Sequence, residues 1–166
     1  MCGIVGYIGN KNATPVLVNA LKKLEYRGYD SAGIAVFNGQ DILVRKVKGA
    51  LKALEEKIAK ETIEGSLGIG HTRWATHGEP SDINAHPHLN ESGTIAVVHN
   101  GIIENFAKLK AWLQSEGVVF KSDTDTEVIA HLINYYYEDS LDIFEAVKAT
   151  VNRLEGSYAL GVLCKD

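Results

Sequence analysis

The sequence is poor in cysteine, proline and positive charge, and it contains no long apolar run. Two cysteines among 166 residues, Cys2 and Cys164, are too few for the disulfide framework of a secreted protein. No stretch approaches the roughly 18 consecutive apolar residues of a membrane span. The N-terminus also lacks the basic stretch of a secretory signal. We therefore expect a cytoplasmic protein with reduced cysteines and no association with membranes.

The charge balance and the metal-ligating residues exclude further classes. A net charge of −4 gives no electrostatic reason to bind nucleic acid. His86 and His88 form the only close histidine pair, without a third ligand at a known spacing, and the cysteines form no Cys-x-x-Cys set. We expect neither a metal site nor a cofactor. A hydrophobic content of 45% is ordinary for one globular domain of this length.

Hydrophobic patterns predict a mixed order of strands and helices in a single domain. An early hairpin, with Asn38 and Gly39 at its turn, argues against a simple parallel sheet. Residues 95–98 are apolar on both faces of a strand, which indicates a sheet covered on both sides. We expect a layered α/β sandwich. Its strands are predicted at 3–8, 31–37, 42–47, 67–74, 94–99, 118–120 and 158–164, and its helices at 14–25, 50–60, 105–116, 124–137 and 141–154.

The second residue is the strongest chemical signal. Removal of Met1 would leave Cys2 with a thiol and a free α-amine. An α-amine of this kind has a pKa of roughly 7.7–8.0, so it can act as a base near neutral pH. A terminal nucleophile activated by its own amine is a known catalytic scheme. A Cys–His pair, using Cys2 with His71, His77 or His99, is the competing arrangement.

Polar residues gather at the ends of the apolar strands. Arg27 and Asp30 occupy a glycine-containing turn before a strand, where their opposite charges favour an ion pair. Arg73 follows another strand, and its planar donors suit bidentate capture of a carboxylate. Trp74, beside it, opens a long loop and suits either the core or a roof over a pocket.

Two further segments suit a polar substrate. Asn100 and Gly101 form a tight turn or, with an amide and a backbone N–H, an oxyanion site. Acidic residues then open a helix, where they suit capping by Asp123 or Thr124 and the helix dipole. A carboxylate in this position, such as that of Asp125, would also suit the ammonium group of an amino acid.

Five motifs in consistent order give the sequence a family resemblance. After the opening CGIVG at residues 2–6, it contains LEYRGYDSAG at 24–33, HTRWATHG at 71–78, NAHPH at 84–88, HNGIIEN at 99–105 and TDTEVIAH at 124–131. These motifs resemble the N-terminal nucleophile (class II) glutamine amidotransferases, and more narrowly the glutaminase domain of the glutamine–fructose-6-phosphate aminotransferase (glucosamine-6-phosphate synthase) family. The resemblance implies a four-layer α-β-β-α sandwich of two antiparallel sheets.

The resemblance also implies roles for individual residues. Cys2 would be the nucleophile and its amine the general base, with Asn100 and Gly101 as the oxyanion hole. The remaining roles concern L-glutamine: Arg73 would hold its α-carboxylate, Asp125 its α-ammonium, Thr76 and His77 would line its pocket, Trp74 would belong to a lid, and Arg27 and Gly28 would support the terminal residue.

The implied reaction is hydrolysis of L-glutamine through a Cys2 thioester. In the family, the ammonia serves to convert fructose 6-phosphate into glucosamine 6-phosphate, in isomerase domains that this sequence lacks. We expect residues 1–166 to be a C-terminally truncated glutaminase domain of an enzyme that forms homo-oligomers. A class II amidotransferase with another acceptor and a glutamine-binding module without turnover are the alternatives. Removal of Met1 distinguishes the enzyme from the binding module, because a module without turnover needs no free Cys2 amine.

Overall fold

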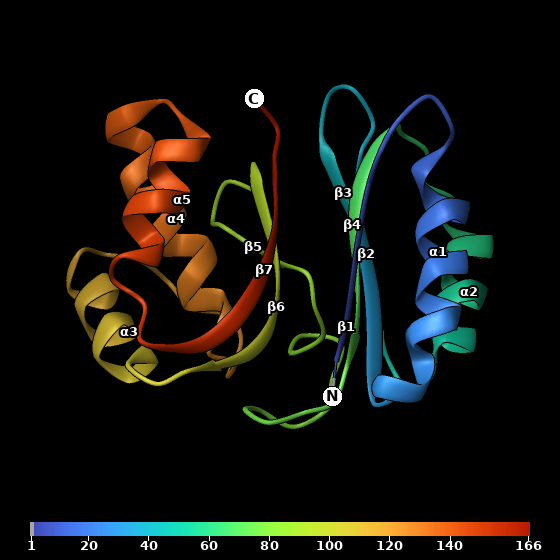
Figure 1. Cartoon of the computed structure of the whole chain (residues 1–166), viewed down its shortest axis with the longest axis horizontal. Helices are drawn as coiled ribbons and strands as arrows, with labels where there is room; N and C mark the ends of the chain where they lie inside the picture. The colour runs from blue at the N-terminus through green and yellow to red at the C-terminus, as the bar shows by residue number, and fades with distance from the viewer. Residues whose placement is uncertain (1) are drawn as a thin grey trace.

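Two antiparallel sheets lie face to face between two layers of helices (Figure 1). The computed structural model describes residues 2–166. The first sheet has the strand order β1-β4-β2-β3, comprising β1 (Gly3–Ile8), β4 (Leu67–Arg73), β2 (Ser31–Phe37) and β3 (Ile42–Lys48). Helices α1 (Ala13–Leu24) and α2 (Leu51–Lys60) cover its outer face, and a 3₁₀ turn at Glu25–Arg27 follows α1.

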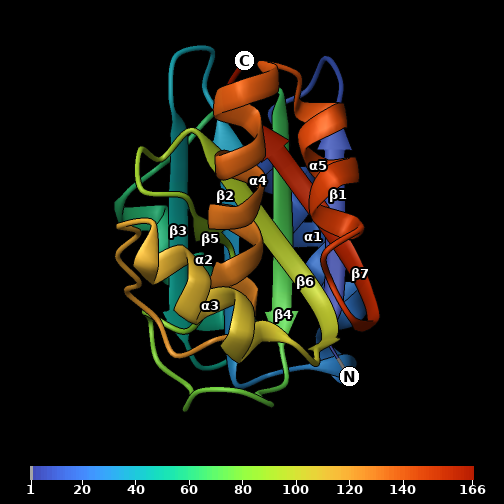
Figure 2. The ribbon, with the colours of Figure 1, turned by 90° about the vertical axis from the view of Figure 1, so that its left-hand side faces the viewer.

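The second sheet has three strands in the order β5-β6-β7. Its outer face is covered by three helices, with α4 lying over β6 (Figure 2). These elements are β5 (His88–Leu89), β6 (Ile95–Ile103), β7 (Gly156–Cys164), α3 (Phe106–Ser115), α4 (Thr126–Ser140) and α5 (Ile143–Val151). The expected four-layer sandwich of antiparallel sheets is therefore confirmed.

Alternation along the strands explains the layers. In β6, Ile95 and Val97 face the helices, whereas Ala96 and Val98 pack against the first sheet. Likewise Ile34 of β2 packs under α1, and its neighbour Ala35 faces the second sheet. Both strands are buried on both faces, as the unbroken apolar runs predict.

Local signals account for several boundaries. Asn12 caps α1, since its side-chain oxygen accepts a hydrogen bond from the Thr14 amide at 3.2 Å. Asn38 accepts hydrogen bonds from the amides of Gln40 and Asp41 at the β2–β3 hairpin. Gly117, at φ 92°, ends α3 as predicted.

Two predicted elements are wrong. Residues 118–120 form no strand, because the Val118 amide bonds back to the last turn of α3 at Leu113 and the side chains of Val118 and Phe120 pack against the helical core. The strand predicted to break at His99 continues as β6 through Asn100 and Gly101 to Ile103. Within residues 2–166, no helix has the length and apolar character required to cross a bilayer.

Candidate active site

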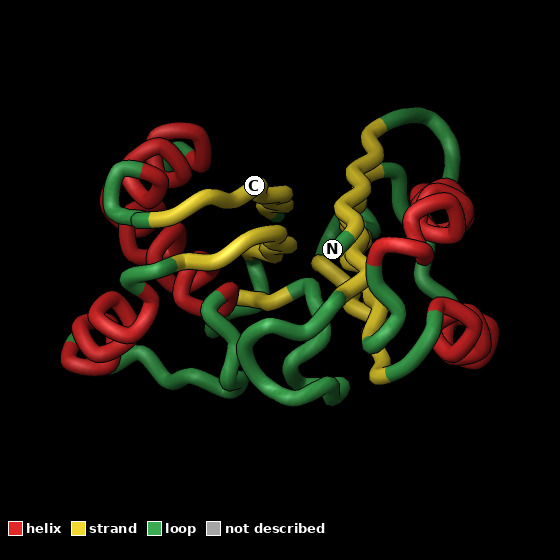
Figure 3. The backbone as a smooth tube through the Cα atoms, turned by 60° about the horizontal axis from the view of Figure 1, so that its bottom comes forward, coloured by secondary structure: helices red, strands yellow, loops and turns green. Residues whose placement is uncertain are grey.

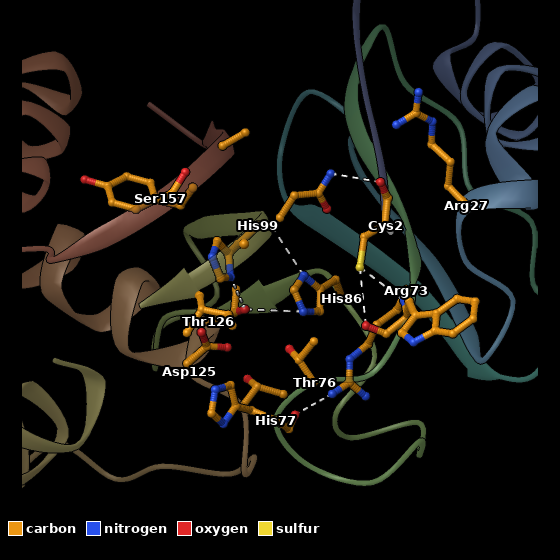
Figure 4. Close-up of a pocket in the computed structure, with 17 residues that line it drawn as sticks. Cys2, Arg27, Arg73, Thr76, His77, His86, His99, Asp125, Thr126 and Ser157 are labelled. Carbon is orange, nitrogen blue, oxygen red and sulfur yellow. Dashed lines mark hydrogen bonds between the residues drawn. The ribbon is translucent and has the colours of Figure 1, made fainter. Parts of the chain in front are cut away.

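A cavity of about 640 Å³ opens where the two sheets meet near the end of β4 (Figure 4). Its size lies in the range of ligand pockets. In Figure 3, loops run across the lower part of the view, between the two halves of the molecule. All but one of the predicted site residues line this cavity, namely Cys2, Arg27, Arg73, Trp74, Thr76, His77, Asn100, Gly101 and Asp125. The exception is Gly28, which does not line it.

Cys2 reaches the cavity from the residue before β1, and the backbone of Trp74, directly after β4, contacts its sulfur. The Trp74 amide donates to Cys2 Sγ at 3.1 Å, and Sγ lies 3.5 Å from the Trp74 carbonyl oxygen. Burial raises the pKa of the Cys2 thiol, while the Trp74 amide opposes that rise. Both sulfur contacts within residues 2–166 are to Trp74 and neither is to a histidine, which argues against the Cys–His pair.

Arg73 is buried at the end of β4, on the same strand face as Ile69. Its Nη2 donates to the backbone carbonyls of His77 and Gly78, the latter at 3.0 Å, and so ties down the loop after β4. Its Nη1 has no hydrogen-bond partner among the described residues. A buried donor without a partner is costly, so a carboxylate ligand would relieve it.

Asp125 approaches the cavity from the second half of the sandwich. It precedes α4 at the N-cap position, but its side chain does not cap that helix. Instead, its Oδ2 accepts a hydrogen bond from the Ile103 amide at 2.9 Å, across from the end of β6. The predicted capping is made by Thr124, whose Oγ1 accepts a hydrogen bond from the Glu127 amide at 3.4 Å, whereas Asp125 links the start of α4 to the end of β6. Asp125 is 4% exposed and lines the cavity with Thr126 (Figure 4).

Asn100 projects from β6 toward the first sheet, as its alternation with Ala96 and Val98 requires. Its Nδ2 donates to the Cys2 carbonyl at 3.1 Å. Gly101 follows at φ 110°, and a Cβ there would lie 2.2 Å from the Ser157 carbonyl oxygen of β7. The glycine is thus required by the close approach of β7 and not by a turn.

The support around Cys2 differs from the expectation. Arg27 makes no ion pair with Asp30 among the described residues; its Nε donates to the Tyr26 hydroxyl at 2.9 Å. Asp30 instead accepts from the Ala75 amide and from Ser31 Oγ, which anchors the start of the loop. Gly28 packs against β4, where a Cβ would lie 2.7 Å from the Arg73 carbonyl carbon.

The loop residues lie at the mouth of the cavity. Trp74 is 49% exposed, and its ring meets Tyr29 edge-on with centroids 5.4 Å apart. The His77 ring lies 5.1 Å from that of Phe106, between the loop and α3. Trp74, Thr76 and His77 all line the cavity, and Figure 4 shows Thr76 and His77 near Asp125.

A column of buried histidines lies beside the cavity, and two of its members, His86 and His99, line it. His71 and His99 were predicted only as alternative partners of Cys2, and His86 was not predicted as part of the site. The rings of His71 and His86 stack at 4.1 Å, and the His99 ring lies parallel beyond, 6.4 Å from His86. Burial lowers the pKa of His71 to about 4 and that of His86 well below its usual value, so both are neutral near pH 7. The alternation of Ile69, His71 and Arg73 along one strand face was the available signal.

Metal binding has no support in the described part of the chain. No group of three or more His, Cys, Asp or Glu side chains in residues 2–166 is arranged to hold a metal ion. The histidine column instead uses its ring nitrogens for hydrogen bonds, such as that of His99 Nδ1 with Thr126 Oγ1 at 2.8 Å.

Comparison with curated proteins gives long, highly similar matches. The chain is 63% identical over all 166 residues to a glutamine–fructose-6-phosphate aminotransferase (isomerizing) of Caldanaerobacter subterraneus subsp. tengcongensis, of which it spans 27%. It is 55% identical to the protein of the same name in Thermococcus kodakarensis, of which it spans 28%. The chain therefore corresponds to little more than a quarter of the length of these relatives.

The solved structures agree with the fold. A glutamine phosphoribosylpyrophosphate amidotransferase from B. subtilis superimposes with a TM-score of 0.85 over 99% of this chain and 35% of its own, at 27% identity. A family model described as a glutamine amidotransferase domain matches residues 71–166, which carry Arg73, Asn100 and Asp125. Because that match covers more than half of the chain and the fold and sequence relatives agree with it, the chain belongs to the glutamine amidotransferase domain family.

Proposed function

We propose that this domain hydrolyses L-glutamine to glutamate and ammonia through a thioester on Cys2. One observation carries the proposal: a thiol and two oppositely charged side chains converge on a single cavity from the two halves of the sandwich. Cys2 and Arg73 come from the first sheet, and Asp125 comes from the second half of the sandwich. This arrangement matches a zwitterionic amino acid with a reactive group at its far end.

Binding would use the charged residues. Arg73 would hold the α-carboxylate of glutamine with its unpartnered Nη1, because its Nη2 is already committed to the loop carbonyls. Asp125 would hold the α-ammonium, with Thr76 and His77 lining the pocket and Trp74 part of a lid. Arg27 and Gly28 would support Cys2 from the turn behind it. Glutamine would then lie with its side-chain amide at Cys2.

The chemistry would proceed in two steps. The α-amine of Cys2, once Met1 is removed, would take the thiol proton as the sulfur attacks the side-chain amide carbon. Met1 itself lies outside the described residues. The C–S bond forms while the carbonyl oxygen becomes an oxyanion, stabilised by Asn100 Nδ2 and the Gly101 amide. The C–N bond then breaks, the amine passes its proton to the departing ammonia, and water hydrolyses the thioester to glutamate.

The same chemistry would supply ammonia to a sugar phosphate in the whole enzyme. The relatives' names give glutamine and fructose 6-phosphate as substrates. We place the acceptor reaction, which forms glucosamine 6-phosphate, in the part of those relatives that this chain does not match. Residues 1–166 would then be their glutaminase portion. Two free cysteines, Cys2 and Cys164, are consistent with the reducing conditions of the cytoplasm.

Replacement of the nucleophile is the direct test. In mature protein, Cys2→Ala should lower glutamate release from glutamine by at least about 10³-fold, because the thioester cannot form. Glutamine binding should remain measurable by calorimetry, since the recognition groups lie elsewhere. Cys164→Ser is the matched control and should retain turnover, because Cys164 ends β7 and does not line the cavity. Turnover at the unmodified rate in Cys2→Ala would refute the terminal-nucleophile assignment.

A product assay tests whether residues 1–166 release ammonia without carrying out the acceptor reaction. Residues 1–166, freed of Met1 and given glutamine with fructose 6-phosphate, should release glutamate and form no amino sugar. Formation of an amino sugar by this chain would show that the acceptor site has been misplaced.

A further inference from the structure

His71 contacts the catalytic amide from behind. It lies on β4 opposite Ile4 of β1 and Gly33 of β2, in the centre of the first sheet, and its side chain is fully buried. Its Nε2 is 2.9 Å from Asn100 Oδ1 and 3.0 Å from the His99 carbonyl oxygen. A side chain of the first sheet thus touches two consecutive residues of β6.

The His99 carbonyl determines which nitrogen of His71 carries the proton. A backbone carbonyl oxygen only accepts hydrogen bonds, so His71 Nε2 must be the donor in this contact. The neutral imidazole carries a single ring proton, which leaves Nδ1 bare. His71 Nδ1 is indeed buried without a hydrogen-bond partner among the described residues.

The proton on Nε2 in turn determines the orientation of the Asn100 amide. A donor at His71 Nε2 is satisfied by the amide oxygen and repelled by the amide NH₂. The oxygen therefore faces His71, and the NH₂ group faces the Cys2 carbonyl at 3.1 Å. A rotated amide would place two donors together in a buried site, where an unpaired group is costly.

We infer that His71 is a positioning residue for amide hydrolysis: its Nε2–H, fixed by the His99 carbonyl, aims the Asn100 NH₂ group at the Cys2 end of the cavity. The inference rests on the proposed function, because it assigns the amide NH₂ to oxyanion stabilisation. It assigns His71 no contact with substrate and no role in proton transfer.

The surroundings of His71 keep this arrangement in place. The His86 ring stacks on it at 4.1 Å and 13° between planes, which restricts rotation of the imidazole. Burial lowers the pKa of His71 to about 4, so the ring remains neutral throughout the neutral pH range. Orientation of the amide is therefore built in before glutamine binds, as electrostatic preorganisation requires.

Two amide substitutions provide a matched pair. In His71→Gln, the side-chain nitrogen can occupy the place of Nε2 and still donate to Asn100. In His71→Asn, the shorter amide places its nitrogen near the former Nδ1, away from Asn100. Both variants should be made in the full chain, freed of Met1, with kcat and KM for glutamine measured. We expect kcat to fall about 10- to 100-fold in His71→Asn with KM within about threefold, and to fall less than about fivefold in His71→Gln.

A second measurement separates positioning from general damage. Alkylation of Cys2 by iodoacetamide generates no oxyanion, so its rate in His71→Asn should match that of the unmodified protein. Placing His71→Asn in an Asn100→Ala background should cause no further loss of kcat, because the donor is already absent. Equal losses in the Gln and Asn variants, slowed alkylation, or multiplied losses in the double variant would each overturn the inference.

The tautomer of His71 can be read without turnover. The ¹⁵N chemical shifts of its ring should show a protonated Nε2 and a bare Nδ1 at pH 7. A proton on Nδ1 would overturn the inference whatever the kinetics. If the unmodified protein releases no glutamate, the proposed function fails, and this measurement still decides the orientation of the amide.

Discussion

Arg73 and Asn100 face the same cavity but are expected to control different kinetic constants. Asn100→Ala should lower kcat about 10²- to 10³-fold with little change in KM, because an oxyanion donor acts on the transition state. Arg73→Lys should chiefly raise KM, because a lysine cannot hold the loop carbonyls of His77 and Gly78 while also presenting a second nitrogen to a carboxylate. Steady-state kinetics with glutamine distinguish them. The same kinetic pattern in both variants would contradict the assigned roles.

The site residues were predictable where the side chain itself and its neighbours in the sequence indicate its chemistry. Cys2, Arg73 and Asn100 stand out as polar side chains at the ends of apolar runs, within motifs that resemble a known family. The contact between the Asp125 carboxylate and the Ile103 amide was not predictable, because nothing in the sequence places the end of β6 beside the start of α4. The contact of His71 with Asn100 was not predictable for the same reason, since Asn100 lies in the other sheet.

At the scale of elements, β2 packs so closely against the backbone of His86 that no side chain fits at Gly33. A Cβ at this position would lie 2.0 Å from the His86 carbonyl oxygen, which is backbone and cannot move away cheaply. Gly33→Ala should therefore lower the free energy of unfolding by about 2–4 kcal/mol. Gly6→Ala in β1 is the matched control, because a Cβ there meets nothing within 4 Å and alanine is the better strand residue. Urea denaturation of both variants measures the difference, and equal stability would refute the steric argument.

The strands with clear boundaries were predicted well, and those defined by pairing were not. β1 and β2 have the predicted bounds, because turn residues flank each apolar run. β6 extends beyond its apolar segment to Ile103, because pairing with β7 continues past Asn100 and Gly101. Residues 118–120 have strand-like composition, but the side chains of Val118 and Phe120 pack against the core formed with α3 and α4.

For the whole molecule, the buried histidines predict how stability depends on pH. Burial lowers the pKa values of His71, His86, His88 and His99, so these rings stay neutral in the folded state while the unfolded chain protonates them below about pH 6.5. The unfolded state then binds more protons, and stability falls as the pH falls. Each such histidine contributes up to ~1.4 kcal/mol per pH unit.

Urea denaturation at pH 7, 6 and 5 should accordingly show a steady decline in the free energy of unfolding. His88→Gln should reduce the slope of that decline by up to ~1.4 kcal/mol per pH unit, which is the contribution of one proton. The substitution disturbs little else, because the His88 ring makes one hydrogen bond among the described groups, to Thr124 Oγ1. The carboxylate of Glu127, whose pKa is lowered to about 2 by hydrogen bonds that outweigh its burial, adds a further loss only below about pH 4.5. A stability that is constant from pH 7 to pH 5 would contradict the assignment of neutral, buried rings.

The layering of the molecule followed from the sequence, whereas its strand order did not. Apolar runs such as that of residues 95–98 require cover on both faces, and this requirement yields a sandwich. The order β1-β4-β2-β3 depends on which strands meet across more than 60 intervening residues, as Gly3 and Thr72 do. No local pattern encodes such a pairing.

The division of the cavity between two sheets has a consequence for damaged molecules. Each half has its own helix-covered core, and a third core between the sheets, which includes Ile69 and Val98, joins the two halves. Under the proposed mechanism, a molecule with only its first half intact would keep the Cys2 thiol. It would lack the Asn100 amide that stabilises the oxyanion and the Asp125 carboxylate that binds the α-ammonium group. Under that mechanism, loss of the second half alone would therefore abolish hydrolysis and leave no unselective activity behind.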